Sequence, residues 1–377
     1  MSSRGAKKTG RPTIRDVAAA VGVSAITVSR ALRSPELVSE GLRRKIDAAV
    51  GRLGYVSNRI AGNLSVGRSN IVAIVVPNMR NAFFSTMIDT MSAVLEPAGC
   101  QILIAASRYD VDVEERLIES LLGWRPAGLV LVGSGRARAL QARLRQSGVP
   151  VIETWDLGSD PVDTLIGFSH QDVGHAIGVH LQERGFRRIG FIGAAMESDV
   201  RASARYDGFR AALEERGRRP VAEVRLPELA SVDGGGRSLG DLLARAPSAD
   251  AVFCSNDVLA LGALFECHRR RVRVPDDIAL AGFGDLDASA CAVPPITSVR
   301  PPGEEIGRRA AQLVLQRMGE PSRSRARRRV KIDLGFTLVE RESTRAVRDA
   351  GGAAATGRRS DSTVESGRAP TLSSRRP

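Results

Sequence analysis

Only four cysteines occur among the 377 residues, and no two of them form a CxxC pair. Neither a zinc site nor a disulfide framework is therefore expected. The sequence also lacks any apolar run of about eighteen residues, the length that a transmembrane helix needs. Its basic N-terminus, MSSRGAKKTGRPT, has no apolar stretch of the kind that forms a signal peptide. These absences predict a cytoplasmic protein that binds no membrane.

Motifs of common enzyme classes are missing as well. There is no nucleophile elbow, HExxH motif or P-loop, and the GSGR stretch at 133–136 lacks the third glycine of a dinucleotide-binding fingerprint. His170, His175 and His180 recur every five residues, but this spacing places neighbours about 140° apart on a helix. We therefore expect no metal, no cofactor and no enzymatic activity.

Positive charge is concentrated at the two ends of the chain. Residues 1–69 carry 13 Lys and Arg against 4 Asp and Glu, whereas residues 70–319 carry 28 against 31. Residues 320–377 are basic again, with 14 against 7. A basic N-terminal segment ahead of a nearly neutral body indicates a polyanionic partner, bound through phosphate neutralisation. A solvated, disordered arm would explain the same charge.

Three short amphipathic helices are predicted in this basic segment. Thr13 and Ser24 stand where they cap the first and second helices, and Gly22 separates the two by a short turn. This spacing is typical of a helix-turn-helix, although three such helices could equally form a plain packing unit. A third helix is expected between the Ser39 cap and Gly54. The expected ranges are 14–21, 25–32 and 40–53.

The stretch from Thr13 to Leu64 carries a family resemblance. It reads TIRDVAAAVGVSAITVSRAL, then VS, then LGYVSNRIAGNL, with DVA, GVS, TVSR, GY and N-R-x-A-x-x-L at fixed offsets. Without a gap, it resembles the DNA-binding segment of the LacI/GalR family of repressors. The resemblance implies that double-stranded operator DNA is the partner of this segment, with the second helix in the major groove.

The resemblance also implies which side chains read the operator. Members of the family use the first two residues of the recognition helix and an arginine one turn later, which are Ala25, Ile26 and Arg30 here. Ala25 and Ile26 cannot donate hydrogen bonds, so we expect apolar contacts such as one with a thymine methyl, while Arg30 suits a guanine. Hydroxyl side chains should hold phosphates and set the register. The expected hydroxyl contacts are Thr13, Ser24, Thr27 and Ser29.

Asn58 to Leu64 resembles the hinge helix of the same family, which forms only on operator DNA. The resemblance implies DNA contacts for Asn58, Arg59 and Ala61, and it makes Leu64 the apolar wedge that enters the minor groove and kinks the duplex. Gly62 lowers helix propensity by about 1 kcal/mol relative to alanine, so we expect disorder without DNA. An ordinary linker would have a similar composition.

Replacing Leu64 with alanine should weaken binding to the operator far more than binding to unrelated DNA, because only the operator complex uses the wedge. Titrations of the full-length protein against both DNAs, followed by fluorescence anisotropy, measure the two affinities. Equal losses on both DNAs would exclude the wedge role.

Apolar runs alternate with amphipathic stretches between residues 70 and 345. IVAIVV, GLVLV and IALAGF are examples, and each precedes a helical pattern, which implies parallel strands in βαβ units. About ten strands fit two doubly wound α/β lobes better than one sheet. The stretch resembles the family's sensor domain, of periplasmic-binding-protein-like fold, in which the chain crosses between lobes three times. We expect the crossings near Ser169, at 298–301 and near Val330.

Ligands in such folds lie beyond the carboxyl ends of the strands, here in the cleft between the lobes. The resemblance places amide, carboxylate, aromatic and arginine side chains there, which suit a hydroxyl-rich or anionic small molecule. Each of them taken alone could be a surface or capping residue. The first lobe is expected to contribute Asn78, Arg80, Asn81, Phe83, Phe84, Tyr109, Glu153 and Asp156. The second lobe is expected to contribute Arg201, Arg205, Asn256 and Asp285.

Several stretches look close to the gluconate-operon repressor branch of the family, notably FCSNDVLALGALFEC, VPDDIALAGF and DLGFTLVERES. Many members place an aspartate directly after the strand that reads ALAGF here, whereas this chain has Gly284. Loss of that carboxylate would suit an anionic ligand, although Asp285 could replace it. A sugar acid is the expected effector, with a neutral or phosphorylated sugar as the alternative.

The sequence therefore predicts a homodimeric repressor of sugar or sugar-acid catabolic genes, released from DNA by a small molecule. A periplasmic sugar-binding protein would explain only the body, and a cytosolic sugar-metabolising enzyme with an accessory DNA-binding domain would need a catalytic constellation. The expected segments are a basic arm (1–11), an all-α helix-turn-helix domain (12–57), a hinge (58–69), a two-lobed sensor (70–345) and a disordered tail (346–377).

Overall fold

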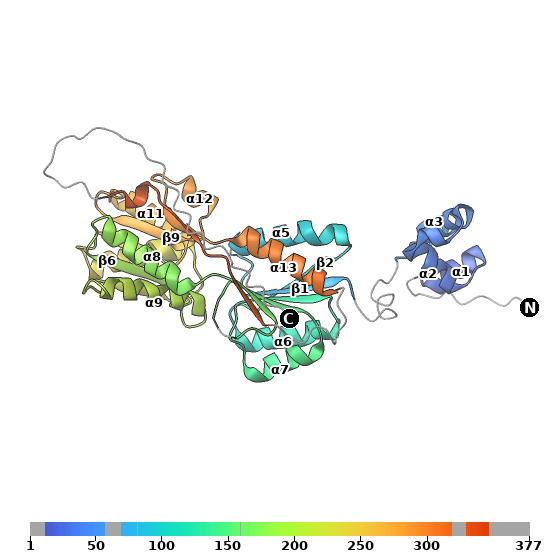
Figure 1. The fold of residues 1–377 in the computed structure, drawn as a ribbon. Coiled ribbons are helices and arrows are strands. Elements are labelled where there is room, and N and C mark those ends of the chain that lie inside the picture. Colours follow the sequence, from blue (N-terminus) through green and yellow to red (C-terminus); the bar gives the residue numbers. More distant parts are fainter. Residues whose placement is uncertain (1–11, 57–68, 81, 159, 319–328, 347–377) are drawn as a thin grey trace, which may run out of the picture.

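The computed structural model describes residues 12–56, 69–80, 82–158, 160–318 and 329–346. They form a small helical domain and an α/β domain with two sheets (Figure 1). The predicted arm, all but the first residue of the tail and all but the last residue of the hinge lie outside the described residues. The predicted DNA contacts Asn58, Arg59, Ala61 and Leu64 and the cleft residue Asn81 also lie outside them.

Local capping rules build the helical domain. The Thr13 and Asp16 side chains form a reciprocal capping box at the first helix, which ends at Gly22 with a left-handed φ of 74°. Val17, Val28 and Ile46 are fully buried, one from each helix, and they make the centre of the small core. The elements are α1 (Ile14–Val21), α2 (Ala25–Arg33), η1 (Pro35–Leu37) and α3 (Glu40–Leu53). The predicted helix-turn-helix is therefore present.

The first lobe is a parallel six-stranded sheet in the order β11-β5-β4-β3-β1-β2. Its central strands are fully buried, because helices cover both faces: α5 and α13 lie on one, α6 and α7 on the other (Figure 1). The strands are β1 (Ile71–Val76), β2 (Gln101–Ala106), β3 (Gly128–Val132), β4 (Val151–Thr154), β5 (Thr164–Gly167) and β11 (Val330–Asp333). The helices are α5 (Ala82–Leu95), η2 (Glu96–Ala98), α6 (Val111–Gly123), α7 (Arg138–Ser147) and α13 (Gly303–Met318).

The second lobe repeats this plan in the order β12-β10-β9-β8-β6-β7, with β12 antiparallel to β10. Side chains of α8 and α9 join one hydrophobic cluster, and those of α10 and α11 another, so these two pairs cover opposite faces of the sheet. The strands are β6 (Ile189–Ala194), β7 (Glu223–Leu226), β8 (Ala251–Cys254), β9 (Ala279–Phe283), β10 (Thr297–Arg300) and β12 (Thr337–Val339). The helices are α8 (His170–Glu183), α9 (Val200–Glu214), α10 (Val232–Arg245), α11 (Asp257–Arg270), α12 (Asp287–Ala290) and η3 (Glu342–Thr344).

The two doubly wound lobes are thus as predicted, and the chain crosses between them after β5, after β10 and after β11. The first two crossings fall where the sequence placed them. The third does not: Val330 begins β11, which still pairs with β5 of the first lobe, so the crossing comes only after Asp333. The strands that the βαβ pattern predicted are parallel, and β12, which was not predicted, is antiparallel to β10.

Helices α8 and α9 cross unusually closely, because each places a glycine at the contact. A Cβ on Gly174 would lie 1.7 Å from the carbonyl oxygen of Arg205, and a Cβ on Gly208 would lie 1.8 Å from the carbonyl oxygen of Gln171. Backbone therefore packs directly on backbone. This contact fixes how the first turn of α8 faces the middle of α9.

Replacing Gly208 with alanine should lower the free energy of unfolding by about 1–3 kcal/mol, because the new Cβ must push the two backbones apart. Gly123→Ala in α6 is the matched control, since no atom lies within 4 Å of its added Cβ. It should be neutral or stabilising by up to about 1 kcal/mol. Urea unfolding measures both, and similar values for the two variants would contradict the close crossing.

Candidate functional site

Helix α2 presents the side chains expected to read DNA. Ile26 is 72% exposed and Arg30 is exposed, as a base-reading pair requires, whereas Ala25 is half-buried against the small core. The Ser24 hydroxyl accepts a hydrogen bond from the Thr27 amide at 3.1 Å, which caps the helix. Ala25 is therefore only partly exposed for the expected DNA contact, whereas the Ile26 side chain is free to enter a DNA groove.

Strained residues gather at the carboxyl ends of the strands, where the cleft is expected. Tyr109 follows β2 with a φ of 62°, Trp155 follows β4 with 64°, Ala195 follows β6 with 51° and Asp285 follows β9 with 50°. The left-handed region costs a residue with a side chain about 1 kcal/mol or more. Such strain concentrates at functional sites, so its distribution supports a site at these strand ends in both lobes.

Arg205, from the middle of α9, is a buried cation in this region. Arg205 is only 4% exposed. Its Nη1 lies 2.9 Å from Nδ1 of His170, and its guanidinium carbon lies 4.1 Å from the centroid of the Phe283 ring. Its Nε is buried without a hydrogen-bond partner in the described part of the chain. Burial lowers the pKa of Arg205 to about 10, in spite of the negative charge of Asp199. The group is charged at neutral pH and poorly compensated.

Arg201, one turn earlier on α9, extends from the second lobe to the first. It pairs with Asp199 at 3.4 Å, donates a hydrogen bond to Tyr109 and lies 5.9 Å from the centroid of that ring. A Cβ on Gly133, at the end of β3, would lie 2.7 Å from Nη1 of Arg201, so glycine makes room for the guanidinium. Burial raises the pKa of Tyr109 to about 12. Three of the expected cleft residues, Tyr109, Arg201 and Arg205, are thus brought together.

Aromatic rings connect the two lobes beside these arginines. Phe83 at the start of α5 lies 6.0 Å from Phe283 at the end of β9, and 5.2 Å from Trp155. A Cβ on Gly284 would lie 3.5 Å from the Phe83 ring, so residue 284 also faces the first lobe. Phe84, by contrast, is only 2% exposed and packs in the core, so its expected place in the cleft wall does not fit.

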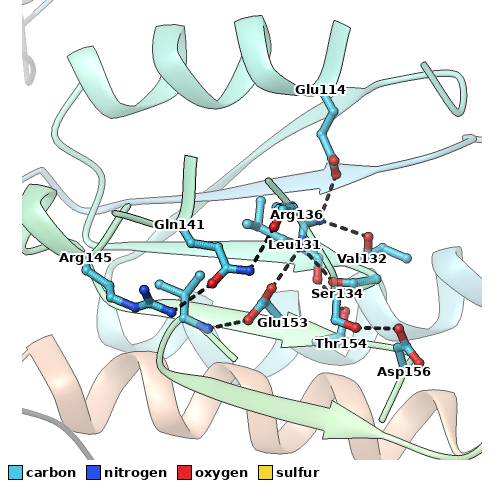
Figure 2. A network of polar contacts seen from close by, with 12 residues as sticks. Glu114, Leu131, Val132, Ser134, Arg136, Gln141, Arg145, Glu153, Thr154 and Asp156 are labelled. Carbon is cyan, nitrogen blue, oxygen red and sulfur yellow. Dashed lines mark hydrogen bonds and ion pairs between the residues drawn. The ribbon is translucent and has the colours of Figure 1, made fainter. Parts of the chain in front are cut away.

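Glu153 does not line the cleft as expected, because its carboxylate is buried within the first lobe (Figure 2). It accepts hydrogen bonds from Arg136 Nη1 at 3.1 Å and from the Val162 amide at 2.7 Å. Arg136 also binds Glu114 at 2.7 Å and the Gly133 carbonyl at 2.8 Å. Burial raises the pKa of Glu153. This network fixes the loop after β3 through contacts inside the first lobe.

Three other polar residues expected in the cleft accept hydrogen bonds from backbone amides. Asp156 accepts a hydrogen bond from the Ser134 hydroxyl at 2.5 Å (Figure 2). It also accepts one from the Leu157 amide at 2.7 Å. Asn78 accepts from the amide of Arg80, whose own side chain is exposed, at 2.8 Å. Asn256 caps α11 by accepting from the Leu259 amide at 3.1 Å. Asn78 and Asn256 therefore act as capping residues, the alternative that the sequence left open for them.

Asp285 is held by two arginines. Its carboxylate lies 2.5 Å from Arg300 Nε and 2.6 Å from Arg341 Nη2, and its side chain is almost inaccessible. Arg300 ends β10 at the second crossing, and Arg341 follows β12 beyond the third. The structure therefore places Asp285 as a clamp on two lobe connections, and not as a replacement for a ligand-binding carboxylate after β9.

The three histidines that recur every five residues have unrelated partners. His170 contacts Trp155 and Arg205, His175 pairs with Glu215 at 2.9 Å, and His180 lies 2.8 Å from the Thr344 hydroxyl. Within the described ranges, no three metal-ligating side chains come together in a group that could hold an ion. No described helix is long and apolar enough to cross a membrane.

Sequence reasoning overlooked several residues that the fold brings to the site. Among them are His170, Asp199, Phe283 and Gly133, which lie within one or two residues of a strand end or at the start of a helix. The signal available in the sequence was their position at the ends of predicted strands or the starts of the helices that follow them. Their contacts, however, come from distant parts of the chain.

A helix-turn-helix followed by a two-lobed α/β domain with a charged inter-lobe site defines a ligand-responsive transcription regulator. Comparisons with known proteins agree in both parts. A model of bacterial regulatory proteins of the lacI family matches residues 13–58, and a periplasmic binding protein-like domain matches residues 179–344. The chain belongs to the LacI family, and it is a transcription regulator rather than an enzyme.

Relatives match most of the chain. The HTH-type transcriptional regulator GntR of Pseudomonas aeruginosa is 41% identical over 345 residues, which cover 91% of this chain and 98% of that protein. A LacI-family regulator structure from Silicibacter pomeroyi is 32% identical, with a TM-score of 0.82, and covers 89% of this chain and 99% of its own. The structure of the regulator GntR from Chromobacterium violaceum is 38% identical, with a TM-score of 0.67, covering 73% and 99%.

Replacing Asp285 with alanine should lower the free energy of unfolding of the α/β domain by about 3 kcal/mol, because Arg341 would be left largely buried without its carboxylate. Glu305→Ala is the control, since its pairs with Arg308 and Arg309 are exposed and worth at most about 1 kcal/mol. Thermal and urea unfolding measure the difference. If Asp285→Ala lowers the free energy of unfolding no more than Glu305→Ala does, the contacts of Asp285 with the two arginines do not stabilise the fold.

Proposed function

We propose that the chain is a dimeric repressor that is released from its operator when a sugar acid of the gluconate type binds between the lobes. The observation that supports an acidic effector is the buried guanidinium of Arg205. Its Nε has no hydrogen-bond partner among the described residues, and none of the described carboxylates forms an ion pair with it. A ligand carboxylate would satisfy this cation through short, charge-assisted hydrogen bonds.

The neighbouring groups suit the rest of such a ligand. Tyr109 and Arg201 lie beside Arg205 with hydrogen-bonding groups, and Phe83 and Phe283 supply apolar surface. Sugar acids combine one carboxylate with several hydroxyls and a carbon chain, so they match this mixture. The formal charges of Arg201 and Asp199 already compensate each other, which leaves Arg205 for one carboxylate and disfavours a multiply charged phosphorylated sugar.

The site supports regulation because its parts come from both lobes. Tyr109, Gly133 and Phe83 belong to the first lobe, whereas Arg201 and Arg205 belong to the second. A ligand between them binds most tightly in one relative position of the lobes, and this difference in affinity shifts the equilibrium. In a dimer on a pseudopalindromic operator, that shift changes the spacing of the two DNA-reading helices. Coupling of this kind is typically about 1–3 kcal/mol.

Arg205→Met tests the effector class, because it removes the charge and keeps an unbranched side chain on the Phe283 ring. The wild-type protein, bound to the DNA upstream of its own gene, should be released by gluconate. The variant should need at least about tenfold more, the loss expected for a hydrogen bond to a charged group. Fluorescence anisotropy of the labelled operator measures release.

Arg210→Met is the matched control, since Arg210 lies on the same helix with an exposed side chain. It should respond to gluconate as the wild type does, and both variants should bind the operator with wild-type affinity when no effector is added. Release of the wild type by neutral sugars and by no acid would contradict the anionic effector. Tighter operator binding with gluconate would make the acid a corepressor.

A further inference from the structure

His170 lies at the junction of the two lobes and contacts both. It is the first residue of α8, directly after the first crossing, and it is buried. Its Nε2 lies 3.0 Å from the carbonyl oxygen of Trp155 in the first lobe, and its Nδ1 lies 2.9 Å from Nη1 of Arg205 in the second. Both ring nitrogens are therefore engaged, one by each lobe.

The two partners determine the protonation of the ring. A carbonyl oxygen can only accept, so Nε2 carries the hydrogen and donates it to Trp155. A guanidinium can only donate, so Nδ1 is unprotonated and accepts from Arg205. Burial, together with the positive charges of Arg205 and Arg201, lowers the pKa of His170 well below its ordinary value. The imidazole is neutral.

The surrounding packing leaves the ring and the guanidinium little freedom. The imidazole centroid lies 4.6 Å from that of Phe168 and 5.8 Å from that of Phe283. Phe283 also covers one face of the Arg205 guanidinium. The close glycine contact of α8 with α9 holds the two backbones at this level, because Gly174 packs on the carbonyl oxygen of Arg205 itself.

A neutral acceptor has a particular electrostatic consequence here. Asp199 is the negative group that acts most strongly on Arg205, yet its ion pair at 3.4 Å is with Arg201. His170 orients one N–H of Arg205 without cancelling any of its charge. A carboxylate in the place of the imidazole would make a buried ion pair and leave the site without an unmatched cation.

We propose that His170 is the positioning residue that sets the specificity of the site for anions: it orients Arg205 through a neutral acceptor and so leaves the arginine charge for a ligand carboxylate. The inference rests on the sugar-acid effector proposed above. In this proposal, His170 determines the preference for an anion without touching the ligand itself.

The variants His170→Asn and His170→Asp test this inference, since the two side chains have the same shape, both offer an oxygen to Arg205, and only the aspartate is charged. Calorimetric titration of the full chain compares D-gluconate with D-glucitol, which has the same carbon chain and no carboxylate. The asparagine oxygen can accept from Arg205, so His170→Asn should keep the preference for gluconate, with a loss of affinity of about fivefold or less. His170→Asp should lose about tenfold or more in gluconate affinity relative to His170→Asn, with the glucitol affinities of the two variants equal.

Equal gluconate affinities of the Asn and Asp variants would overturn the specificity role, while the Arg205→Met result would still stand. If the wild type binds glucitol and no carboxylate, the proposed effector class fails, and the specificity inference fails with it. Thermal unfolding of each variant shows whether it is folded, and only folded variants enter the comparison.

A second measurement tests the positioning role without any effector. The chain has only four histidines, so ¹⁵N spectra of histidine-labelled protein, assigned with His170→Asn, can resolve its ring. At about pH 6.5, where a free histidine is half protonated, His170 should show a protonated Nε2 and an unprotonated Nδ1. Arg205→Met should shift the Nδ1 signal. A doubly protonated ring, or a hydrogen on Nδ1, would overturn the orientation of Arg205 by a neutral acceptor.

Discussion

The contact of α8 with α9 is the constraint on which the charged site depends. Gly174 and Gly208 let two helix backbones touch, and only this separation places the first turn of α8 against the middle of α9. His170 and Arg205 meet there, and the Phe283 ring closes the arrangement from β9. A buried arginine without a carboxylate partner is costly, so the fold must hold it in place by packing. The glycines make that packing possible.

The carboxylates near the cleft are committed elsewhere, and this is why the cation remains uncompensated. Asp285 is bound by Arg300 and Arg341, Glu153 by Arg136, and Asp156 by the Ser134 hydroxyl and the backbone. Each of these contacts also fixes a loop or a lobe connection. The same side chains thus stiffen the walls of the site and keep negative charge from its centre.

The sequence predicted those parts that depend on neighbouring residues and missed those that depend on distant ones. The caps at Thr13, Ser24 and Gly22 define the helix-turn-helix locally, and the long apolar runs identify eight strands. The short strands β7, β10, β11 and β12 mix polar and apolar residues and were not recognised. For the site, Tyr109, Arg201 and Arg205 were predicted together. Glu153 and Asp285 were misplaced because the arginines that bind them come from other loops, and His170 was considered only as a metal ligand.

The connections between the lobes have a consequence for how the chain is made. The first sheet needs β11, and the second needs β12 and the buried hydroxyls of Ser343 and Thr344, so both lobes are completed by the last described residues. The helical domain needs only its own first fifty or so residues and has mainly local contacts. During synthesis, the DNA-reading unit can therefore fold early, while the sensing lobes must wait until Ser343 and Thr344 have left the ribosome.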